Sequence, residues 1–379
     1  QQLAAHHRQQ FSIPVIGITG SNGKTIVKEW LYQLLHEDYN IVRSPKSYNS
    51  QIGVPLSVWQ MNAQHTLAIF EAGISEQGEM LRLEKIIQPT IGIFSNVGQA
   101  HDENFESPKQ KIHEKVKLFY NAELLVYCKD YLLLQEELTQ NKNLKNTNIF
   151  SWSRKSRANL QIGKIKKSGH DTEIQAVFNN DFIKVVIPFT DEASIENAIQ
   201  CWALMLHLGY ENDLIAVRMK LLSPVAMRLE LKEGVNNCSI INDSYNSDLG
   251  SLSIALDFLN QQKQHPNKTL ILSDILQSGK NEENLYKEVA NLLDKKGVQK
   301  FIGIGEALSR QKELFRQEKK FFNTTTDFLQ AYNNSFFNDE AILLKGARAF
   351  SFEDISRLLQ QKAHAVSYTH LTLPTNREV

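Results

Sequence analysis

Residues 17–25, near the N-terminus, have the composition of a phosphate-binding loop. They read Gly-Ile-Thr-Gly-Ser-Asn-Gly-Lys-Thr. The common form of such a loop is G-x-x-x-x-G-K-[ST], in which backbone N–H groups surround the phosphates, the lysine neutralises charge and the hydroxyl binds Mg²⁺. Gly23, Lys24 and Thr25 fit this form, but Ile18 occupies the position of its first glycine. The stretch therefore indicates either a nucleotide site of different spacing or a glycine-rich turn without a ligand.

The neighbouring sequence supplies the structural setting that a phosphate-binding loop requires. The apolar run at 14–19 predicts a strand, and residues 24–36 predict a helix with apolar residues along one face. A loop between a strand and a helix places the phosphate at the helix N-terminus, where the helix dipole favours negative charge. We therefore expect residues 17–25 to bind a nucleotide.

Two side chains that could bind metal follow other predicted strands. Glu71 lies in the strand pattern at 66–73, and His101 follows the one at 91–98. The carboxyl ends of parallel strands meet at one edge of a sheet, where ligands bind. A carboxylate suits Mg²⁺, whereas an imidazole is a less usual ligand. Taken singly, each residue is better explained as a solvated loop residue, and their shared placement makes a metal site beside the loop an equal alternative.

Apolar runs alternate with helical patterns over most of the chain, as is typical of parallel βαβ units. In the first part we predict strands at 14–19, 66–73, 91–98 and 122–128, an antiparallel meander at 160–188 and one or two helices at 191–222. In the second part we predict strands at 238–243, 268–274, 299–305 and 340–347, with helices at 281–294 and 351–363. The predicted fold class is α/β, with a P-loop-type, mostly parallel central sheet domain followed by a smaller Rossmann-like α/β domain.

Composition argues against several classes of protein. The 379 residues include 42 Lys+Arg and 42 Asp+Glu, so the formal net charge is zero and nucleic-acid binding is not expected. The three cysteines are far apart, which argues against a disulfide framework or a structural zinc site and favours a reducing compartment. No stretch reaches the roughly 20 apolar residues of a membrane span, and no signal-peptide pattern opens the chain. We therefore expect a cytoplasmic protein without membrane insertion.

Several short stretches occur in the order seen in the Mur ligase family, which the chain resembles from residue 1 to about 365. They are GITGSNGKT (17–25), NSQIGVPLSV (49–58), EAG (71–73), SNVGQAH (95–101), EKVKLF (114–119), IENA (195–198), RLE (228–230), NDSYNSDLGSL (242–252) and LLKGAR (343–348). The family's ATP loop has the spacing G-x-x-G-x-x-G-K-[ST], which residues 17–25 match. Ile26 departs from the family, whose members often have threonine there. The resemblance implies that the loop binds ATP.

The resemblance also implies roles for individual residues. ATP would be bound by Gly20, Ser21, Asn22, Gly23, Lys24, Thr25, Asn197, Arg228 and Asp243. Two Mg²⁺ ions would be bound by Thr25, Glu71, His101 and a carbamate-bearing lysine, which the spacing from His101 identifies as Lys115, with Lys117 as the alternative. The catalytic residues would be Lys24, Lys115 and His101, and the substrate would contact Asn246, Lys345 and Arg348. Without the resemblance, these lysines, amides and arginines could equally be surface residues.

The reaction of the family is ATP-driven formation of a peptide bond through an acyl phosphate. The sequences DSYN (243–246) and KGAR (345–348) most resemble the member that adds D-alanyl-D-alanine to UDP-N-acetylmuramoyl-tripeptide in peptidoglycan precursor synthesis. Two alternatives stay open. One is another Mur-type or folylpolyglutamate-type amino acid ligase, and the other is a P-loop nucleotide-binding module that ligates nothing.

The resemblance also implies a division of the chain into domains. We expect a central ATP-binding domain at 1–223, a C-terminal domain at 224–365 and a non-native tail at 366–379. The N-terminal domain with which these ligases hold the UDP-sugar is expected to be missing. The chain also resembles a fused form in which an alanine racemase follows the ligase.

Overall fold

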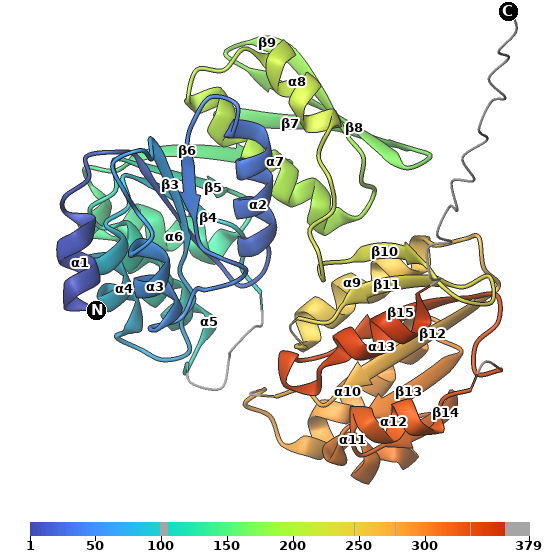
Figure 1. Ribbon diagram of the computed structural model, residues 1–379. Helices are drawn as coiled ribbons and strands as arrows, with labels where there is room; N and C mark the ends of the chain where they lie inside the picture. Colours follow the sequence, from blue (N-terminus) through green and yellow to red (C-terminus); the bar gives the residue numbers. More distant parts are fainter. Residues whose placement is uncertain (99–104, 246, 277, 334, 361–379) are drawn as a thin grey trace, which may run out of the picture.

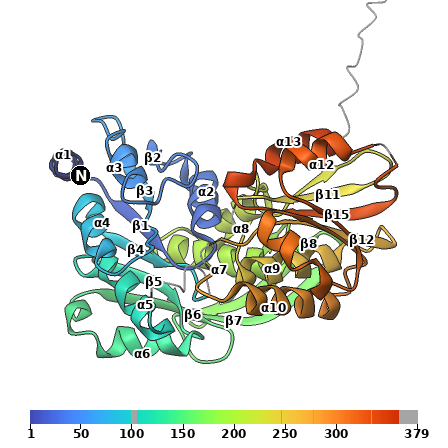
Figure 2. The ribbon, with the colours of Figure 1, turned by 90° about the horizontal axis from the view of Figure 1, so that it is seen from below.

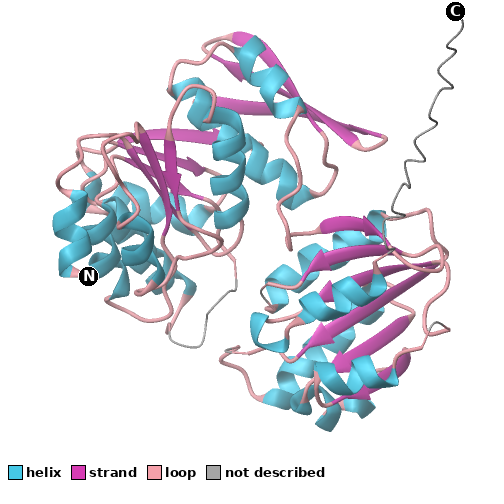
Figure 3. Ribbon diagram, viewed as in Figure 1, coloured by secondary structure: helices cyan, strands magenta, loops and turns pink. Residues whose placement is uncertain are grey.

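The computed structural model describes residues 1–98, 105–245, 247–276, 278–333 and 335–360. Their strands form two sheets, one of nine strands and one of six. Each sheet has helices on both faces, and the two layered bodies lie beside one another in Figures 1, 2 and 3. We call them the central unit, which ends at α8, and the C-terminal unit, which begins at β10; residues 221–229 connect them.

The strands of the central unit are β1 (Val15–Thr19), β2 (Ile41–Arg43), β3 (Leu67–Glu71), β4 (Ile91–Phe94), β5 (Leu124–Cys128), β6 (Asn148–Ser153), β7 (Leu160–Ser168), β8 (Asp171–Phe178) and β9 (Asp181–Ile187). Their order in the sheet is β2-β3-β1-β4-β5-β6-β7-β8-β9. Neighbouring strands from β2 to β7 are parallel. The pairs β7–β8 and β8–β9 are antiparallel, so the meander continues the central sheet.

Both faces of the parallel strands are buried, because successive residues point to opposite sides of a sheet. In β1, Ile16 and Ile18 belong to one hydrophobic cluster and Val15 to the other. The first cluster includes side chains from α2 (Lys24–Leu35), α7 (Glu192–His207) and α8 (Asn212–Lys220). The second includes side chains from α1 (Gln2–Arg8), α3 (Gly53–Val58), α4 (Glu79–Ile87), α5 (Pro108–Val116), η2 (Lys117–Phe119), α6 (Leu132–Gln140) and η3 (Lys142–Leu144).

The C-terminal unit repeats this layered plan on a smaller sheet. Its strands are β10 (Glu230–Glu233), β11 (Ser239–Asp243), β12 (Asn267–Ser273), β13 (Lys300–Ile304), β14 (Glu318–Phe322) and β15 (Glu340–Lys345), in the order β10-β11-β15-β12-β13-β14. One face is covered by α9 (Leu249–Gln261), α10 (Glu282–Lys295), α11 (Glu306–Arg310) and η4 (Lys312–Leu314), the other by α12 (Thr325–Ala331), η5 (Arg348–Phe350) and α13 (Phe352–Leu359). β10 is antiparallel to β11, and the remaining pairs are parallel.

The predicted α/β fold class is confirmed, as are the strands that carry long apolar runs. The sequence analysis did not assign β2, β6, β10 and β14. β2 has three residues, and β10 and β14 are the charged edge strands ELKE and EKKFF, which lack the apolar pattern of a buried strand. Edge strands of this kind are stabilised by a neighbour that a local pattern does not reveal.

The strand order gathers the segments that could do chemistry. β1 lies between β3 and β4, and the three strands are parallel. Their carboxyl ends therefore meet at one edge, bringing together the glycine-rich loop, Glu71 at the end of β3 and the segment that follows β4.

Substitution of Phe70, which precedes Glu71 in β3, tests the hydrophobic core beneath the carboxyl ends of these strands. The Phe70 side chain is 0% exposed, so Phe70→Ala should destabilise the central unit by about 3–5 kcal/mol. The control is Phe182→Ala in β9, where the ring is 93% exposed and the expected change is within about 0.5 kcal/mol. Urea unfolding followed by circular dichroism measures both, and equal midpoints would contradict the described core.

Candidate active site

The glycine-rich loop connects β1 to α2, as the sequence predicts. Gly20 and Gly23 have φ angles of +143° and +82°, which residues with a side chain rarely adopt. A Cβ on Gly20 would lie 2.1 Å from Oγ of Ser95, and one on Gly23 would lie 2.3 Å from Oδ1 of Asn197. The loop backbone therefore approaches its neighbours more closely than any other residue type would allow.

The segment that follows β4 holds the loop in place. The N–H of Ser21 donates to the carbonyl of Asn96 at 3.0 Å, and the N–H of Asn22 donates to Oδ1 of Asn96 at 2.7 Å. In return, Oγ of Ser95 donates to the carbonyl of Asn22 at 2.5 Å, and Oγ of Ser21 pairs with the backbone of Gly98. These bonds fix the loop's shape before any ligand binds.

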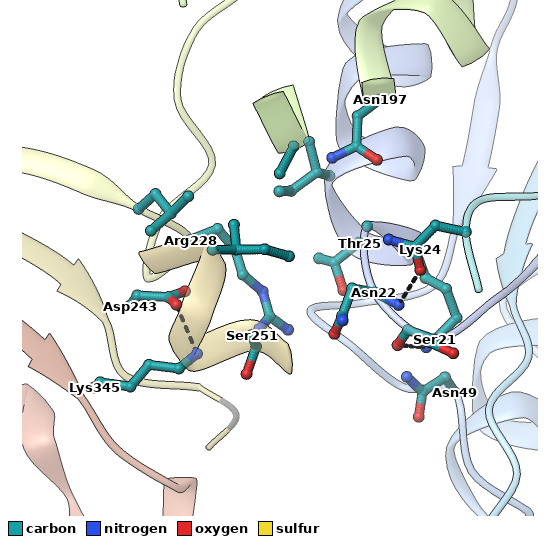
Figure 4. A pocket seen from close by; sticks show the side chains of 16 residues that line it. Ser21, Asn22, Lys24, Thr25, Asn49, Asn197, Arg228, Asp243, Ser251 and Lys345 are labelled. Atoms are coloured by element: carbon teal, nitrogen blue, oxygen red, sulfur yellow. Dashed lines mark hydrogen bonds and ion pairs between the residues drawn. The ribbon is translucent and has the colours of Figure 1, made fainter. Parts of the chain in front are cut away.

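Lys24, the first residue of α2, folds back over the loop (Figure 4). Its Nζ donates to the carbonyls of Gly20 at 2.9 Å and Ser21 at 3.1 Å. Burial lowers the pKa of Lys24 from 10.5 to about 8; the charge of Glu71 opposes this shift and that of Arg228 adds to it. The ammonium group is therefore poorly solvated and would be stabilised by a negatively charged ligand.

Glu71 is a fully buried carboxylate at the end of β3. Its Oε2 accepts a hydrogen bond from Oγ1 of Thr25 at 3.0 Å. Its Oε1 lies 3.0 Å from Nζ of Lys28, an ion pair between two side chains that are both 0% exposed. Nζ of Lys28 also donates to the carbonyls of Ser44, at 2.7 Å, and Lys46. The charge of Glu71 is therefore balanced inside the protein, as a buried carboxylate requires.

Thr25 and Glu71 have the oxygen donors that Mg²⁺ prefers. Oε1 of Glu71 is already paired with the Lys28 ammonium, so an ion at this carboxylate would be held by Oε2, which lies 3.0 Å from Oγ1 of Thr25. The pair fits an ion whose remaining ligands are phosphate oxygens and water. No three His, Cys, Asp or Glu side chains among the described residues are grouped to hold a metal by themselves. His101, expected to bind a second ion, lies outside the described residues.

Of the two lysines considered for a carbamate, Lys115 reaches the loop. Lys115 is buried in α5, and its Nζ donates to the carbonyl of Gly20 at 3.0 Å, the same oxygen that accepts from Lys24. Lys117 instead forms an ion pair with Glu114 at 2.6 Å. The geometry therefore brings Lys115, rather than Lys117, to the phosphate-binding loop.

The loop faces a cavity of ≈ 80 Å³ between the two units, and Figure 4 shows side chains of both units directed toward it. The central unit lines it with Ser21, Asn22, Gly23, Lys24, Thr25, Ile26, Asn49, Asn96, Ala193 and Asn197. The C-terminal side is formed by Arg228, Leu229, Asp243, Ser251, Ile254 and Lys345. The structure thus brings together at one cavity the loop, Asn197, Arg228, Asp243 and Lys345.

The C-terminal side of the cavity is positioned by strand register and by stacking. Asp243 and Lys345 are partners in the parallel pair β11–β15, and Nζ of Lys345 donates to Oδ2 of Asp243 at 2.6 Å. The guanidinium of Arg228 lies 4.1 Å from the ring centroid of Tyr245 and donates from Nη2 to Oγ of Ser47 at 3.2 Å. Arg228 therefore links the C-terminal side to the central unit.

Arg348 does not line this cavity. It is exposed and lines a separate cavity of ≈ 440 Å³, which it shares with Lys46, Arg228, Tyr245 and other residues of both units. Asn246, the other residue expected to contact substrate, lies outside the described residues.

Sequence reasoning missed Lys28, Ser47 and Asn96. Lys28 had a detectable signal, because it lies three and seven residues before the buried Leu31 and Leu35, on the apolar face of α2. A lysine on such a face needs a buried partner. Asn96 lies in the SNVGQAH stretch that carries the resemblance, although no role was predicted for it, and the contacts of Ser47 join segments distant in sequence, for which no local signal exists.

No helix in the described ranges is both long and apolar enough to cross a bilayer. The fold and the loop define an α/β protein in which a P-loop-type loop faces a cavity between two units.

Known proteins share this organisation. The model of the Mur ligase middle domain matches residues 18–205. The chain is 29% identical over 362 residues to the UDP-N-acetylmuramoyl-tripeptide–D-alanyl-D-alanine ligase of Rickettsia prowazekii, covering 94% of this chain and 80% of that protein. Identity to the ligase of the same name from Bacillus subtilis is 27% over 363 residues, covering 94% and 78%.

Solved structures agree on the fold. A crystal structure of MurF from Acinetobacter baumannii has a TM-score of 0.80 at 22% identity, covering 95% of this chain and 80% of that one. MurF ligase from Thermotoga maritima, solved in complex with ADP, has a TM-score of 0.76 at 20% identity, covering 94% and 82%. The chain belongs to the Mur ligase family, whose class of reaction is ATP-dependent formation of an amide bond.

Gly20 tests the shape of the loop. Gly20→Ala should weaken ADP binding by more than about tenfold, because its Cβ would collide with Ser95 and the backbone of Asn96 in addition to the strain of positive φ. Gly169→Ala is the matched control, since Gly169 has a φ of +61° but nothing within 4 Å of the added Cβ. Isothermal titration calorimetry measures both affinities. Equal affinities would show that the loop's close packing is not needed for binding.

Lys24 predicts a pH dependence of nucleotide binding. With a pKa of about 8 before ligand binds, Lys24 is mostly neutral above pH 8, yet a phosphate favours its charged form. ADP binding at pH 8.5–9 should therefore be accompanied by proton uptake, and affinity should fall as pH rises through this range. Calorimetry in buffers of different ionisation enthalpy measures the uptake. Lys24→Arg should abolish it, and uptake that persists in this variant would assign the proton to another group.

Proposed function

We propose that this protein joins D-alanyl-D-alanine to UDP-N-acetylmuramoyl-tripeptide at the expense of ATP. The observation that carries the proposal is the extent of the similarity: relatives with this activity in their name align with 94% of the chain, across both units and the cavity between them. We assign residues 1–223 to the central ATP-binding domain and 224–365 to the C-terminal domain, and we place the reaction in the cytoplasm, where ATP and UDP-linked precursors occur.

In this proposal the phosphates of ATP bind at Gly20, Ser21, Asn22, Gly23, Lys24 and Thr25. Lys24 supplies positive charge, and the N-terminus of α2 supplies its dipole. Asn197 meets the adenine, and Arg228 and Asp243 meet the nucleotide from the other side of the cavity. The cavity of ≈ 80 Å³ is lined by both units, so a nucleotide bound at the loop would be contacted from both sides.

Mg²⁺ would be held by Thr25 and Glu71 at one site and by His101 and Lys115 at a second. Bound Mg²⁺ would offset the repulsion between a substrate carboxylate and the phosphates. Lys115 and Lys24 donate to the same carbonyl oxygen, so two cations converge there. A carbamate on Lys115 would replace one positive charge by a negative one. The side chain would then bind a metal ion instead of repelling it.

The proposed chemical steps are those of the family's reaction. A carboxylate oxygen of the tripeptide attacks the γ-phosphorus, the bond to the β-phosphate oxygen breaks, and ADP leaves. The amine of D-alanyl-D-alanine then attacks the acyl carbon, and phosphate leaves with the former carboxylate oxygen as the amine loses a proton. Lys24 and the loop amides stabilise negative charge on the transferring phosphoryl group, and alignment of the two reactants supplies much of the remaining rate.

Arg348 is proposed to bind the carboxylate of the incoming dipeptide; a substrate contact of Asn246, which lies outside the described residues, stays a proposal from the sequence resemblance. The Arg348 guanidinium is exposed in the ≈ 440 Å³ cavity beside the nucleotide cavity, and arginine binds carboxylates through two parallel hydrogen bonds. Lys345, in contrast, is paired with Asp243, so we assign it to orienting this carboxylate at the cavity. A fusion to an alanine racemase stays a proposal that rests on the sequence resemblance.

Product formation tests the proposal directly. The chain, alone and preceded by the UDP-sugar-binding segment of a relative, is incubated with ATP, Mg²⁺, UDP-N-acetylmuramoyl-tripeptide and D-alanyl-D-alanine. Phosphate release should require both substrates, and mass spectrometry should find the joined pentapeptide. Preference for a single amino acid or for glutamate on folate would instead identify another ligase of the family, and release that ignores every acceptor would refute the ligase function.

The two lysines of α5 and η2 provide a paired test of the carbamate. Lys115→Ala should reduce ligation by at least about a hundredfold, because removing one transition-state group typically has this effect. Lys117→Ala should stay within about threefold of the parent, since Lys117 is paired with Glu114 away from the loop. Ligation rates at saturating substrates measure both. If Lys117→Ala lowered the ligation rate more than Lys115→Ala, the carbamate would be assigned to Lys117.

A further inference from the structure

Ser47 lies where the two units meet the proposed metal site. It belongs to the segment after β2, is 9% exposed, and its hydroxyl has two side-chain partners. One is Oγ1 of Thr25 at 2.8 Å, and the other is Nη2 of Arg228 at 3.2 Å. A single hydroxyl therefore joins a proposed metal ligand of the central unit to an arginine on the C-terminal side.

The direction of these hydrogen bonds follows from counting hydrogens. A guanidinium only donates, so Arg228 donates to Ser47. Thr25 has one hydroxyl hydrogen, and it points to Oε2 of Glu71, a carboxylate that only accepts. The hydrogen of Ser47 must then point to Thr25. The bonds form a chain from Arg228 through Ser47 and Thr25 to Glu71, all in one direction.

We propose that Ser47 is a positioning residue that keeps the Thr25 hydroxyl paired both before and after a metal ion binds. The inference rests on the proposed function, in which Thr25 and Glu71 hold Mg²⁺. A cation bound by both residues would use the carboxylate oxygen of Glu71 that accepts the hydrogen bond from Thr25 in this structure. The hydrogen bond between Thr25 and Glu71 would then be lost. The Thr25 hydrogen must turn to another acceptor, and Oγ of Ser47 is the hydroxyl oxygen at 2.8 Å.

A serine suits this role because its hydroxyl can both donate and accept. When the Thr25 hydrogen turns toward Ser47, the bond between the two hydroxyls reverses while their oxygen atoms stay in place. Ser47 then accepts from both Thr25 and Arg228 with its two lone pairs, and its own hydrogen becomes available to a phosphate oxygen or a water. Without Ser47, the half-buried Thr25 hydroxyl would lose this side-chain acceptor in the metal-bound state, and losing a hydrogen-bond partner there is costly.

Lys28 fixes the segment that carries Ser47. The Lys28 ammonium donates to the carbonyls of Ser44 and Lys46, on either side of Pro45, and is itself held by Glu71. Oγ of Ser44 also accepts from the N–H of Glu71 at 3.1 Å. The segment is therefore anchored to the same carboxylate that Thr25 contacts, so Ser47 keeps its position relative to the metal ligands.

Arg228 is held just as firmly from the other side. Its neighbours Met227 and Leu229 have φ angles of +59° and +52°, a left-handed conformation that costs of order 1 kcal/mol per residue and persists only where surrounding contacts enforce it. The Tyr245 ring stacks on its guanidinium. The connecting segment thus presents Arg228 to Ser47, and the state of the metal ligands is coupled to the C-terminal side of the cavity.

The test compares ADP affinity in Mg²⁺ with ADP affinity in EDTA, measured by calorimetry, so that the metal-dependent gain is obtained without any turnover. Ser47→Ala should lower this gain about tenfold, because it removes the side-chain acceptor to which the Thr25 hydrogen would turn. Ser47→Thr should restore it, since a hydroxyl is retained. Ser57→Ala is the control, because Ser57 is also buried but its hydroxyl donates to the carbonyl of Gly53 within α3. The metal-dependent gain in ADP affinity of this variant should equal that of the parent.

A double-variant comparison tests the link to Arg228. Arg228→Gln should lower the metal-dependent gain in the parent but leave it unchanged in the Ser47→Ala background, because the effect passes through Ser47. The inference would be overturned if Ser47→Ala kept the metal-dependent gain in ADP affinity of the parent. It would also be overturned if the two substitutions lowered this gain independently, so that their effects multiplied. Neither outcome would count against the metal site. If the parent protein itself shows no metal-dependent gain, the proposed metal site fails and the inference fails with it.

Discussion

The buried carboxylate of Glu71 is the constraint on which the arrangement of the site depends. An ionised carboxylate removed from water is stable only when charge and hydrogen bonds compensate it. Lys28 supplies the charge at 3.0 Å and Thr25 supplies a hydrogen bond at 3.0 Å. These partners are three residues apart, on one side of the first turn of α2. The helix must therefore lie across the end of β3 in this orientation, and that orientation sets the direction of the glycine-rich loop.

The same constraint extends to both neighbours of β3 and to the C-terminal unit. The loop is shaped by bonds from the segment after β4, on the far side of β1. On the other side of the sheet edge, Lys28 ties down the segment after β2, which contacts Arg228 through Ser47. Positive charge from Lys24, Lys115 and Arg228 thus collects at the loop and the cavity, where Glu71 and Asp243 are buried anions. Clustered cations of this kind are suited to polyphosphate, and desolvation by burial lowers the pKa of Lys24 in the absence of one.

The sequence predicted the parts of the site that depend on local order. The loop, its strand and helix, and the strand end that carries Glu71 all follow from residues close together in the chain. The resemblance to the Mur ligases added Lys115, Asn197, Arg228, Asp243 and Lys345, which the structure places at the loop or the cavity. Lys28 was missed although its place on an apolar helix face was a usable signal. Asn96 was given no role although it lies in a stretch that carries the resemblance. Ser47 could not be found, since its partners lie 22 or more residues away. The charged edge strands β10 and β14 were missed for the same reason, because the neighbouring strand stabilises them.

The central claim is that a nucleotide polyphosphate binds in the bend between β1 and α2 beside a metal held by Glu71. A crystal structure with Mg²⁺ and a non-hydrolysable ATP analogue tests it most directly. The account predicts phosphate oxygens within hydrogen-bonding distance of the Gly20–Thr25 backbone and Nζ of Lys24, and an ion in contact with Oγ1 of Thr25 and the Glu71 carboxylate. An analogue bound elsewhere, with the bend empty and Lys24 still donating to Gly20, would contradict it.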